Sequence, residues 1–206
     1  MLDNKQFRLI VLIIALLFLV ITGCGGGTSQ TGSKPEAQKQ DIDWETAEVT
    51  AENVKGALSR KAEVSPIFRD NDFPKDITKI EVIDHAVKPG QKNVHIYFKP
   101  ETFWDETDFV KKVGGTSILA SSILYRNPKI EDVVFFALTD MTDQYGKTET
   151  EVVVKLGLNR EVANKVDWKG LADRHTTDPG NIYRIAATRY IHLGVLKNVK
   201  QNEVNL

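Results

Sequence analysis

The sequence predicts an α+β fold: an antiparallel sheet of about four strands packed on one long helix, with short C-terminal helices. Two observations favour this class. Segments with the two-residue periodicity or β-branched content of strands come in two pairs, 77–84 with 93–99 and 133–138 with 152–158. Between the pairs lies segment 105–126, whose apolar residues recur at helical spacing.

The first elements of the domain are a short helix and the first strand pair. Thr50 is a preferred N-cap residue and predicts a helix that ends near Arg60. Pro89-Gly90 is typical of a turn and joins the two strands. Pro100 ends the second strand, because proline has no N–H to donate to a neighbouring strand.

The long helix is predicted to begin after Asp105, with Asp108 three residues later, and to end near Arg126. Gly114 and Gly115 lie in its middle, at a cost of about 1 kcal/mol each relative to alanine. We therefore expect the helix to approach the sheet closely at this point.

The second strand pair forms a hairpin whose turn chemistry sets its register. Asp143 and Gly146 occupy the first and fourth positions of a type I turn with a glycine bulge, which implies a three-residue loop closed by Asp143 and Lys147. This loop predicts the cross-strand pairs Leu138–Val152, Phe136–Val154 and Val134–Leu156.

The predicted register divides the hairpin into two faces. The face expected to pack on the long helix holds Val134, Phe136, Leu138, Val152, Val154 and Leu156. The other face includes Phe135 and Val153 and must either lie under the C-terminal helices or bind a partner, because monomers seldom expose large apolar patches. The candidate binding face therefore comprises Phe135 and Val153, with His95 and Tyr97 of the second strand.

The C-terminal quarter is predicted to form short helices. Asn159 and Asp167 are suitable N-caps for helices 160–166 and 168–174. After the turn Asp178-Pro179-Gly180, Asn181 is expected to cap a third helix, which extends to Leu193. From Lys197 the tail is polar, and we expect it to fray.

The amino terminus has the pattern of an export signal. Thirteen apolar residues, from Leu9 to Ile21, follow a short start that carries Lys5 and Arg8. A membrane-spanning helix would need roughly 20 apolar residues, so the run fits the hydrophobic part of a signal peptide better. The residues that follow, Thr22-Gly23-Cys24, provide the motif that distinguishes the type of signal.

Ile21-Thr22-Gly23-Cys24 resembles the lipobox of bacterial lipoproteins. The resemblance implies cleavage between Gly23 and Cys24, lipidation of Cys24, and a cell-membrane location with the domain facing outside the cytoplasm. The alternative is an uncleaved anchor with an incidental cysteine, which also places the domain outside. Cys24 is the only cysteine, so the sequence excludes an intramolecular disulfide and a cysteine-ligated zinc site.

The chain is thus divided into a signal peptide at 1–23, a lipidated cysteine and tether at 24–40, and one domain at 41–206. The tether consists of small and polar residues and one proline, which predicts a coil. A coil of about 16 residues has a root-mean-square reach of roughly 20 to 25 Å. The domain can therefore stand away from the membrane.

Composition argues against several activities. The net charge of −1 becomes −2 when the signal peptide is removed, and no basic stripe indicates a nucleic-acid partner. No two histidines have the i, i+4 spacing of a helical zinc site, so we expect no metal and no cofactor. Gly115-Thr116-Ser117 begins like the nucleophile elbow of a serine hydrolase, but Leu119 replaces the second glycine. We do not expect an enzyme.

Thr139 to Gly146 resembles a hairpin of small lipoproteins of Gram-positive bacteria, a resemblance that implies no activity and no functional residues. We favour a membrane-anchored lipoprotein whose domain is a binding or protein-interaction module in the cell envelope. The alternatives are an envelope hydrolase without a recognisable motif and a small-solute-binding lipoprotein. The first would need a carboxylate of strongly raised pKa beside a histidine. The second would need an apolar pocket of roughly several hundred cubic ångströms.

Overall fold

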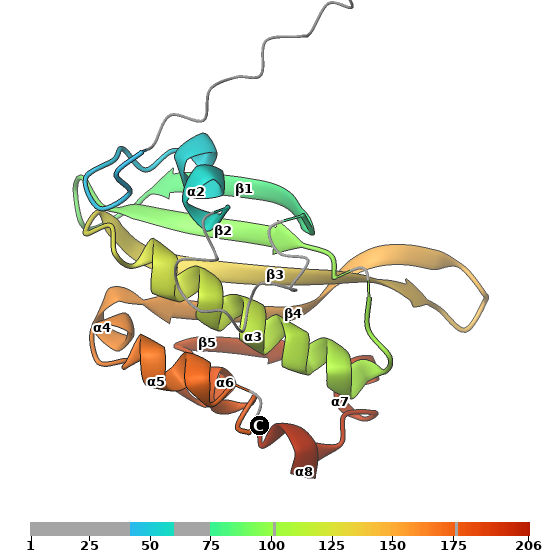
Figure 1. The fold of residues 1–206 in the computed structure, drawn as a ribbon. Coiled ribbons are helices and arrows are strands. Elements are labelled where there is room, and N and C mark those ends of the chain that lie inside the picture. Colours follow the sequence, from blue (N-terminus) through green and yellow to red (C-terminus); the bar gives the residue numbers. More distant parts are fainter. Residues whose placement is uncertain (1–41, 60–74, 101, 176) are drawn as a thin grey trace, which may run out of the picture. The chain divides into compact units, whose positions relative to one another are not determined.

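A five-stranded sheet in the order β1-β2-β3-β4-β5 forms the centre of the domain (Figure 1). The computed structural model describes residues 42–59, 75–100, 102–175 and 177–206, which fall within one compact unit. In chain order the elements are α2 (Ala51–Leu58), β1 (Ile77–Asp84), β2 (Lys92–Phe98), α3 (Glu106–Leu124), β3 (Ile130–Thr142), β4 (Thr148–Asn159), α4 (Arg160–Ala163), α5 (Trp168–Asp173), α6 (Asn181–Ile185), β5 (Thr188–Ile191), α7 (Leu193–Leu196) and α8 (Gln201–Val204).

The α+β class is confirmed, but the sheet is mixed and has one more strand than predicted. β2 and β3 run parallel, whereas the other neighbouring strands are antiparallel. The reason is α3, which returns the chain from the end of β2 to the end at which β2 began. The fifth strand, β5, pairs with β4 and is formed by a segment that the sequence analysis assigned to a helix.

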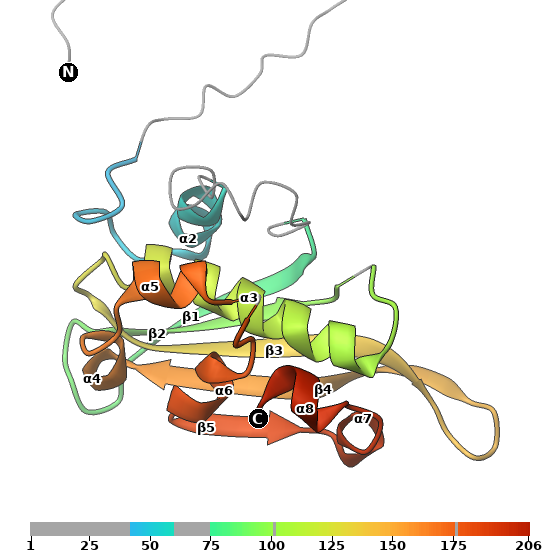
Figure 2. The same cartoon turned by 60° about the horizontal axis from the view of Figure 1, so that its bottom comes forward.

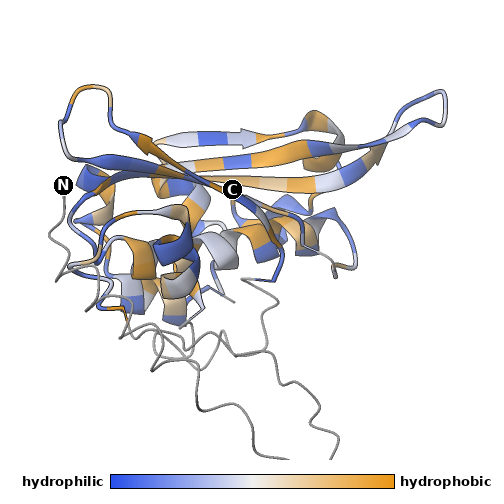
Figure 3. Ribbon diagram, turned by 90° about the horizontal axis from the view of Figure 1, so that it is seen from above, coloured by the Kyte–Doolittle hydropathy of each residue, from blue (hydrophilic) through white to orange (hydrophobic). Residues whose placement is uncertain are grey.

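The helices gather on one side of the sheet, as Figure 3 shows in a view along the layers. α3 packs against β3 and β4, and the C-terminal helices α5, α6 and α8 pack against α3. Figure 2 shows the same arrangement from the C-terminal side. None of the described helices covers the opposite face of the sheet, so of the two alternatives stated for a second face, cover by the C-terminal helices is not found there.

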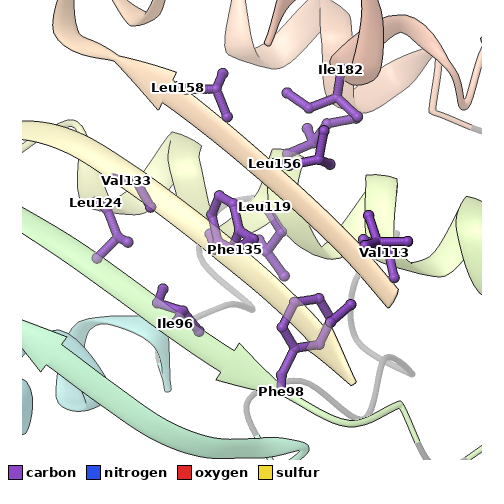
Figure 4. Close-up of a cluster of buried hydrophobic side chains, with 14 of the residues drawn as sticks. Ile96, Phe98, Val113, Leu119, Leu124, Val133, Phe135, Leu156, Leu158 and Ile182 are labelled. Atoms are coloured by element: carbon purple, nitrogen blue, oxygen red, sulfur yellow. The ribbon is translucent and has the colours of Figure 1, made fainter. Parts of the chain in front are cut away.

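The core lies between the sheet and α3. Phe135 of β3 and Leu156 of β4 point toward Leu119 of α3, and all three side chains are fully buried (Figure 4). Further fully or almost fully buried side chains around them are Ile96, Phe98, Val113, Leu124, Val133, Leu158 and Ile182. One continuous apolar layer therefore joins the strands to the long helix and to α6.

The hairpin contains a β-bulge that the sequence analysis did not predict. The pair Leu138–Val152 is confirmed, but Ala137 pairs with Val154, so Val153 is the extra residue of the bulge. Beyond it the predicted register is wrong by one residue: Phe136 pairs with Lys155, and Val134 pairs with Gly157. A one-residue shift moves side chains to the other face of the sheet.

The shift changes which hairpin residues face α3. Val154 and Leu156 are buried on the helix side as predicted. Val133, Phe135 and Ala137 are buried with them, as their cross-strand pairing with Leu158, Leu156 and Val154 requires. The alternate residues of β3, which were predicted to face α3, instead lie half-buried on the opposite face: Val134, Phe136 and Leu138.

The predicted three-residue loop of this hairpin is confirmed. The Asp143 N–H donates to the Lys147 carbonyl at 2.9 Å, and the Asp143 carboxylate accepts from the N–H groups of Tyr145 and Lys147. Gly146 has φ of +82°, a conformation that L side chains rarely adopt.

Gly146→Val is therefore expected to lower the free energy of unfolding by about 1 to 3 kcal/mol through backbone strain. No heavy atom of the rest of the chain lies within 4 Å of a Cβ placed there, so a steric clash would not contribute. Gln144→Val, in the same loop, is the control, and chemical denaturation is the measurement. Equal stability of the two variants would contradict the positive-φ role of Gly146.

Most of the predicted helix caps are confirmed. The side chains of Thr50, Asp105, Asn159 and Asp167 each accept a hydrogen bond from the N–H three residues later, at 2.8 to 3.2 Å. Asn181 is the exception, because it is the first residue of α6, and Gly180 precedes it without a side-chain cap.

The glycines of α3 make room for the C-terminal segment and not for the sheet. A Cβ on Gly114 would lie 2.9 Å from the Pro179 carbonyl and 3.2 Å from the Tyr183 ring. The tail from Lys197 does not fray as predicted, since Val199 and Val204 are buried. The C-terminal residues are thus part of the helical layer.

The predicted cleavage and lipidation residues, Gly23 and Cys24, and the tether lie outside the described residues. Within the described part of the chain, no helix combines the length and apolar content needed to cross a membrane.

Candidate functional site

The face of the sheet opposite α3, called here the open face, is the candidate site. Cross-strand pairing places side chains from all five strands on it. Its main residues are Lys79, Glu81, His95, Tyr97, Asp132, Val134, Phe136, Leu138, Lys155 and Tyr190. Most of them are half-buried, and Tyr190 is 46% exposed.

One row of the open face contains one side chain from each strand. Successive cross-strand partners in this row, called here the ladder, are Lys79, Tyr97, Phe136, Lys155 and Tyr190. The bulge at Val153 is what brings Lys155 opposite Phe136. The ladder therefore depends on the fold and not on any local sequence motif.

The ladder places a lysine on each side of a stacked pair of aromatic rings. The Tyr97 and Phe136 rings stack with centroids 4.4 Å apart and planes 7° from parallel. The ammonium of Lys79 lies 5.3 Å from the Tyr97 centroid, and that of Lys155 lies 5.3 Å from the Phe136 centroid. Each such cation–π contact contributes about 0.5 to 1 kcal/mol at an exposed site. The outer faces of the stacked pair are thus directed at lysines.

The adjacent row holds these side chains in place. The Tyr97 hydroxyl donates to Glu81 Oε2 at 3.1 Å, and Lys79 pairs with Glu81 Oε1 at 2.5 Å. The hydrogen bond from Lys79, followed by that from Tyr97, lowers the pKa of the Glu81 carboxyl. The His95 and Phe136 rings make a T-shaped contact with centroids 5.4 Å apart, and His95 Nδ1 lies 3.7 Å from Glu81 Oε2. The aromatic pair is therefore preorganised.

Lys155 differs from Lys79 in lacking an acidic neighbour. Among the described residues, no carboxylate lies within 4.0 Å of its ammonium, whereas Lys79 is paired with Glu81. Lys155, half-buried at the centre of the open face, can therefore form an ion pair with a carboxylate of another molecule.

The structure brings together two of the four predicted binding residues. His95 and Tyr97 lie on the open face beside Phe136 and Lys155. Phe135 and Val153 are fully buried on the other side, so they are not surface residues. The signal that could have located the open face is Lys155, because a lysine on a central strand marks the face that is open to water.

A histidine and a carboxylate of raised pKa do lie together at one end of the open face. Burial raises the pKa of Asp132, and its Oδ2 is 3.6 Å from His85 Nε2. His85 Nδ1, however, accepts the N–H groups of Val87 and Lys88 at 3.1 and 3.0 Å. His85 thus holds the β1–β2 turn through Nδ1, and its contact with Asp132 at 3.6 Å is longer than a hydrogen bond.

A cavity of about 590 Å³ lies where β2 leads into α3. Its lining residues are Lys75, Asp76, Thr78, Lys99, Pro100, Phe103, Thr139 and Asp140. Lys99 crosses from β2 to the Asp140 carboxylate at 2.8 Å, and this contact lowers the pKa of Asp140. Six of these eight residues are polar or charged and two, Pro100 and Phe103, are apolar, whereas a small-solute carrier would need a pocket lined by apolar side chains.

In the described ranges, no three histidine, cysteine, aspartate or glutamate side chains are grouped so that they could hold a metal ion. Comparisons of the chain with protein-family models, with curated proteins and with solved structures found no match.

Proposed function

We propose that this chain is a lipid-anchored protein of the cell envelope whose domain binds a partner protein through the open face. The anchor is supported by the sequence from Leu9 to Cys24. The partner-binding role is supported by the composition and geometry of the open face.

The observation that carries the proposal is the apolar content of β3 on the open face. A sheet with one solvated face normally directs polar side chains to water and apolar ones to the core. β3 instead directs Val134, Phe136 and Leu138 outward, at the centre of the sheet, while its alternate residues fill the core. Covering this strip with a partner is favourable, because burial of apolar surface stabilises a complex by about 25 cal/mol per Å².

The chemistry of the face indicates the kind of partner. Rigid tyrosine side chains are typical of residues that contribute most to protein–protein binding, because they lose little entropy when they are buried. Tyr97 is held by its stacking and hydrogen bond, and Tyr190 is half-exposed beside Lys155. A complementary surface would be apolar and would place a carboxylate opposite Lys155.

The proposal is tested by photo-crosslinking in intact envelopes. A photoreactive amino acid at Tyr190 is expected to give one discrete adduct with a partner protein. The same group at Lys169, which is 89% exposed on the helical side, should give none. Lys155→Glu should abolish the Tyr190 adduct, because it reverses the charge at the centre of the face, while the melting temperature changes little.

Two results would contradict the open-face proposal. One is an adduct from Lys169 equal to that from Tyr190. The other is a Tyr190 adduct that Lys155→Glu leaves unchanged. Lys165→Glu, on an exposed lysine of the helical layer, is the matched control for the charge reversal.

A further inference from the structure

A second exposed apolar feature lies where β2 leads into α3, away from the open face. Trp104 precedes the N-cap of α3 and is 93% exposed. Leu193, the first residue of α7, is 76% exposed. These two residues are called here the apolar end of the domain.

The loop that carries Trp104 is ordered on both sides of the indole. The ring of Phe103 packs edge-on against Phe109, with centroids 5.0 Å apart. The backbone N–H of Trp104 donates to Asp108 Oδ2 at 3.1 Å, and the Lys112 ammonium donates to the Thr102 carbonyl. The backbone is thus fixed while the largest apolar side chain of the loop remains in water.

Leu193 belongs to the same end of the domain. Just after α7, Asn198 donates to Glu106 Oε1 at 3.1 Å, and the Lys200 N–H donates to Thr107 Oγ1 at 3.0 Å. Both acceptors lie in the first turn of α3, two or three residues after Trp104. Figures 1 and 2 show α7 beside this end of α3.

The acidic groups near the apolar end are already engaged. Asp105 caps α3 and pairs with Lys200, and Glu203 pairs with Lys111. Lys197 is exposed, and no described carboxylate forms an ion pair with it. An indole, an aliphatic side chain and unpaired positive charge together suit the headgroup region of a membrane, where tryptophan is enriched and lysine meets anionic lipid.

The length of the chain before the domain permits such a contact. The Trp44 indole N–H donates to the Ile123 carbonyl, so the first described residues lie at the opposite end of α3 from Trp104. α3 has 19 residues and is about 28 Å long. Residues 24–41 can extend to about 65 Å at most. The tether can therefore pass the length of α3.

We infer that the apolar end rests on the membrane that holds the anchor, with Trp104 and Leu193 in the headgroup region. This inference depends on the proposed anchor at Cys24.

The test uses the full chain, purified from membranes and reconstituted into phosphatidylcholine–phosphatidylglycerol vesicles with brominated acyl chains. Bromine quenches tryptophan fluorescence only at short range. Quenching is expected in the parent and in Trp168→Phe, whose indole packs against Tyr125, and is expected to be lost in Trp104→Phe. Leu193→Ser should weaken it. Because Trp104 is almost fully exposed, its replacement should leave the fold intact.

Two further experiments test the membrane contact separately from the proposed anchor. Mass spectrometry of the parent and of Cys24→Ala shows whether Cys24 carries lipid. A lipidated chain whose quenching is absent, or is unchanged by Trp104→Phe, would overturn the inference and leave the anchor standing. Deletion of 26–39 leaves four tether residues, which span at most about 14 Å, half the length of α3. That variant should stay anchored and lose the quenching, and retained quenching would contradict the proposed orientation.

Discussion

Phe135→Ala is expected to lower the free energy of unfolding by about 3 to 5 kcal/mol, as measured by chemical denaturation. Phe135 is fully buried between β3 and α3, where it points toward Leu119 (Figure 4). Its removal would leave a cavity in the layer that joins the strands to the long helix. The close packing of protein interiors allows only partial collapse around such a cavity.

Phe136→Ala, one residue later, is the matched control because it removes the same ring from the open face. It would lose the stacking on Tyr97 and the contact with Lys155, and we expect a cost of about 1 to 2 kcal/mol. It should also lose the Tyr190 adduct while remaining folded. A loss of stability equal to that of Phe135→Ala would show that the two faces have been assigned wrongly.

The contrast between these neighbours shows where sequence reasoning stopped. The valines 152–154 are consecutive, so no alternation shows which of them is the extra residue of a bulge. The turn at Asp143 sets the register only as far as Val152. Past that point, the bulge changes which β3 residues lie opposite β4, so that Phe135 pairs with Leu156 and Phe136 pairs with Lys155. Choosing this register requires knowledge of the whole sheet.

Features with a local cause could be predicted. The caps at Thr50, Asp105, Asn159 and Asp167 depend on a side chain and an N–H three residues away, and all four are present. The positive φ of Gly146 likewise follows from the turn itself. In each case the interaction energy comes from residues that are close in the sequence.

Features that depend on distant segments could not be predicted. β5 has only four residues and forms by pairing with β4, so its local sequence does not distinguish strand from helix. Gly114 accommodates the Pro179 carbonyl, which is 65 positions away in the chain. The same limit applies to the candidate site: alternation placed His95 and Tyr97 correctly, but their partners Phe136 and Lys155 required the tertiary register.

Arg160→Met is expected to lower the free energy of unfolding by about 2 to 4 kcal/mol, because it removes charged hydrogen bonds and leaves their acceptors without a partner. The guanidinium donates to the carbonyls of Tyr125 at 2.7 Å, Asn127 at 2.5 Å and Ile130 at 2.8 Å. The first two follow the end of α3, where carbonyls have no partner within the helix. Burial lowers the pKa of Arg160, consistent with its position between β3 and Tyr125.

Arg126→Met is the matched control, since Arg126 is exposed just after the same helix and such surface changes usually alter stability by less than about 0.5 kcal/mol. Arg160→Lys should recover only part of the lost stability. The guanidinium presents its donors to three carbonyls in a fixed plane, and a single ammonium cannot reach all three. Equal stability of Arg160→Met and Arg126→Met would refute this role. The Trp44 indole would not replace the lost donor, because its N–H already donates to the preceding carbonyls, those of Ile123 and Leu124.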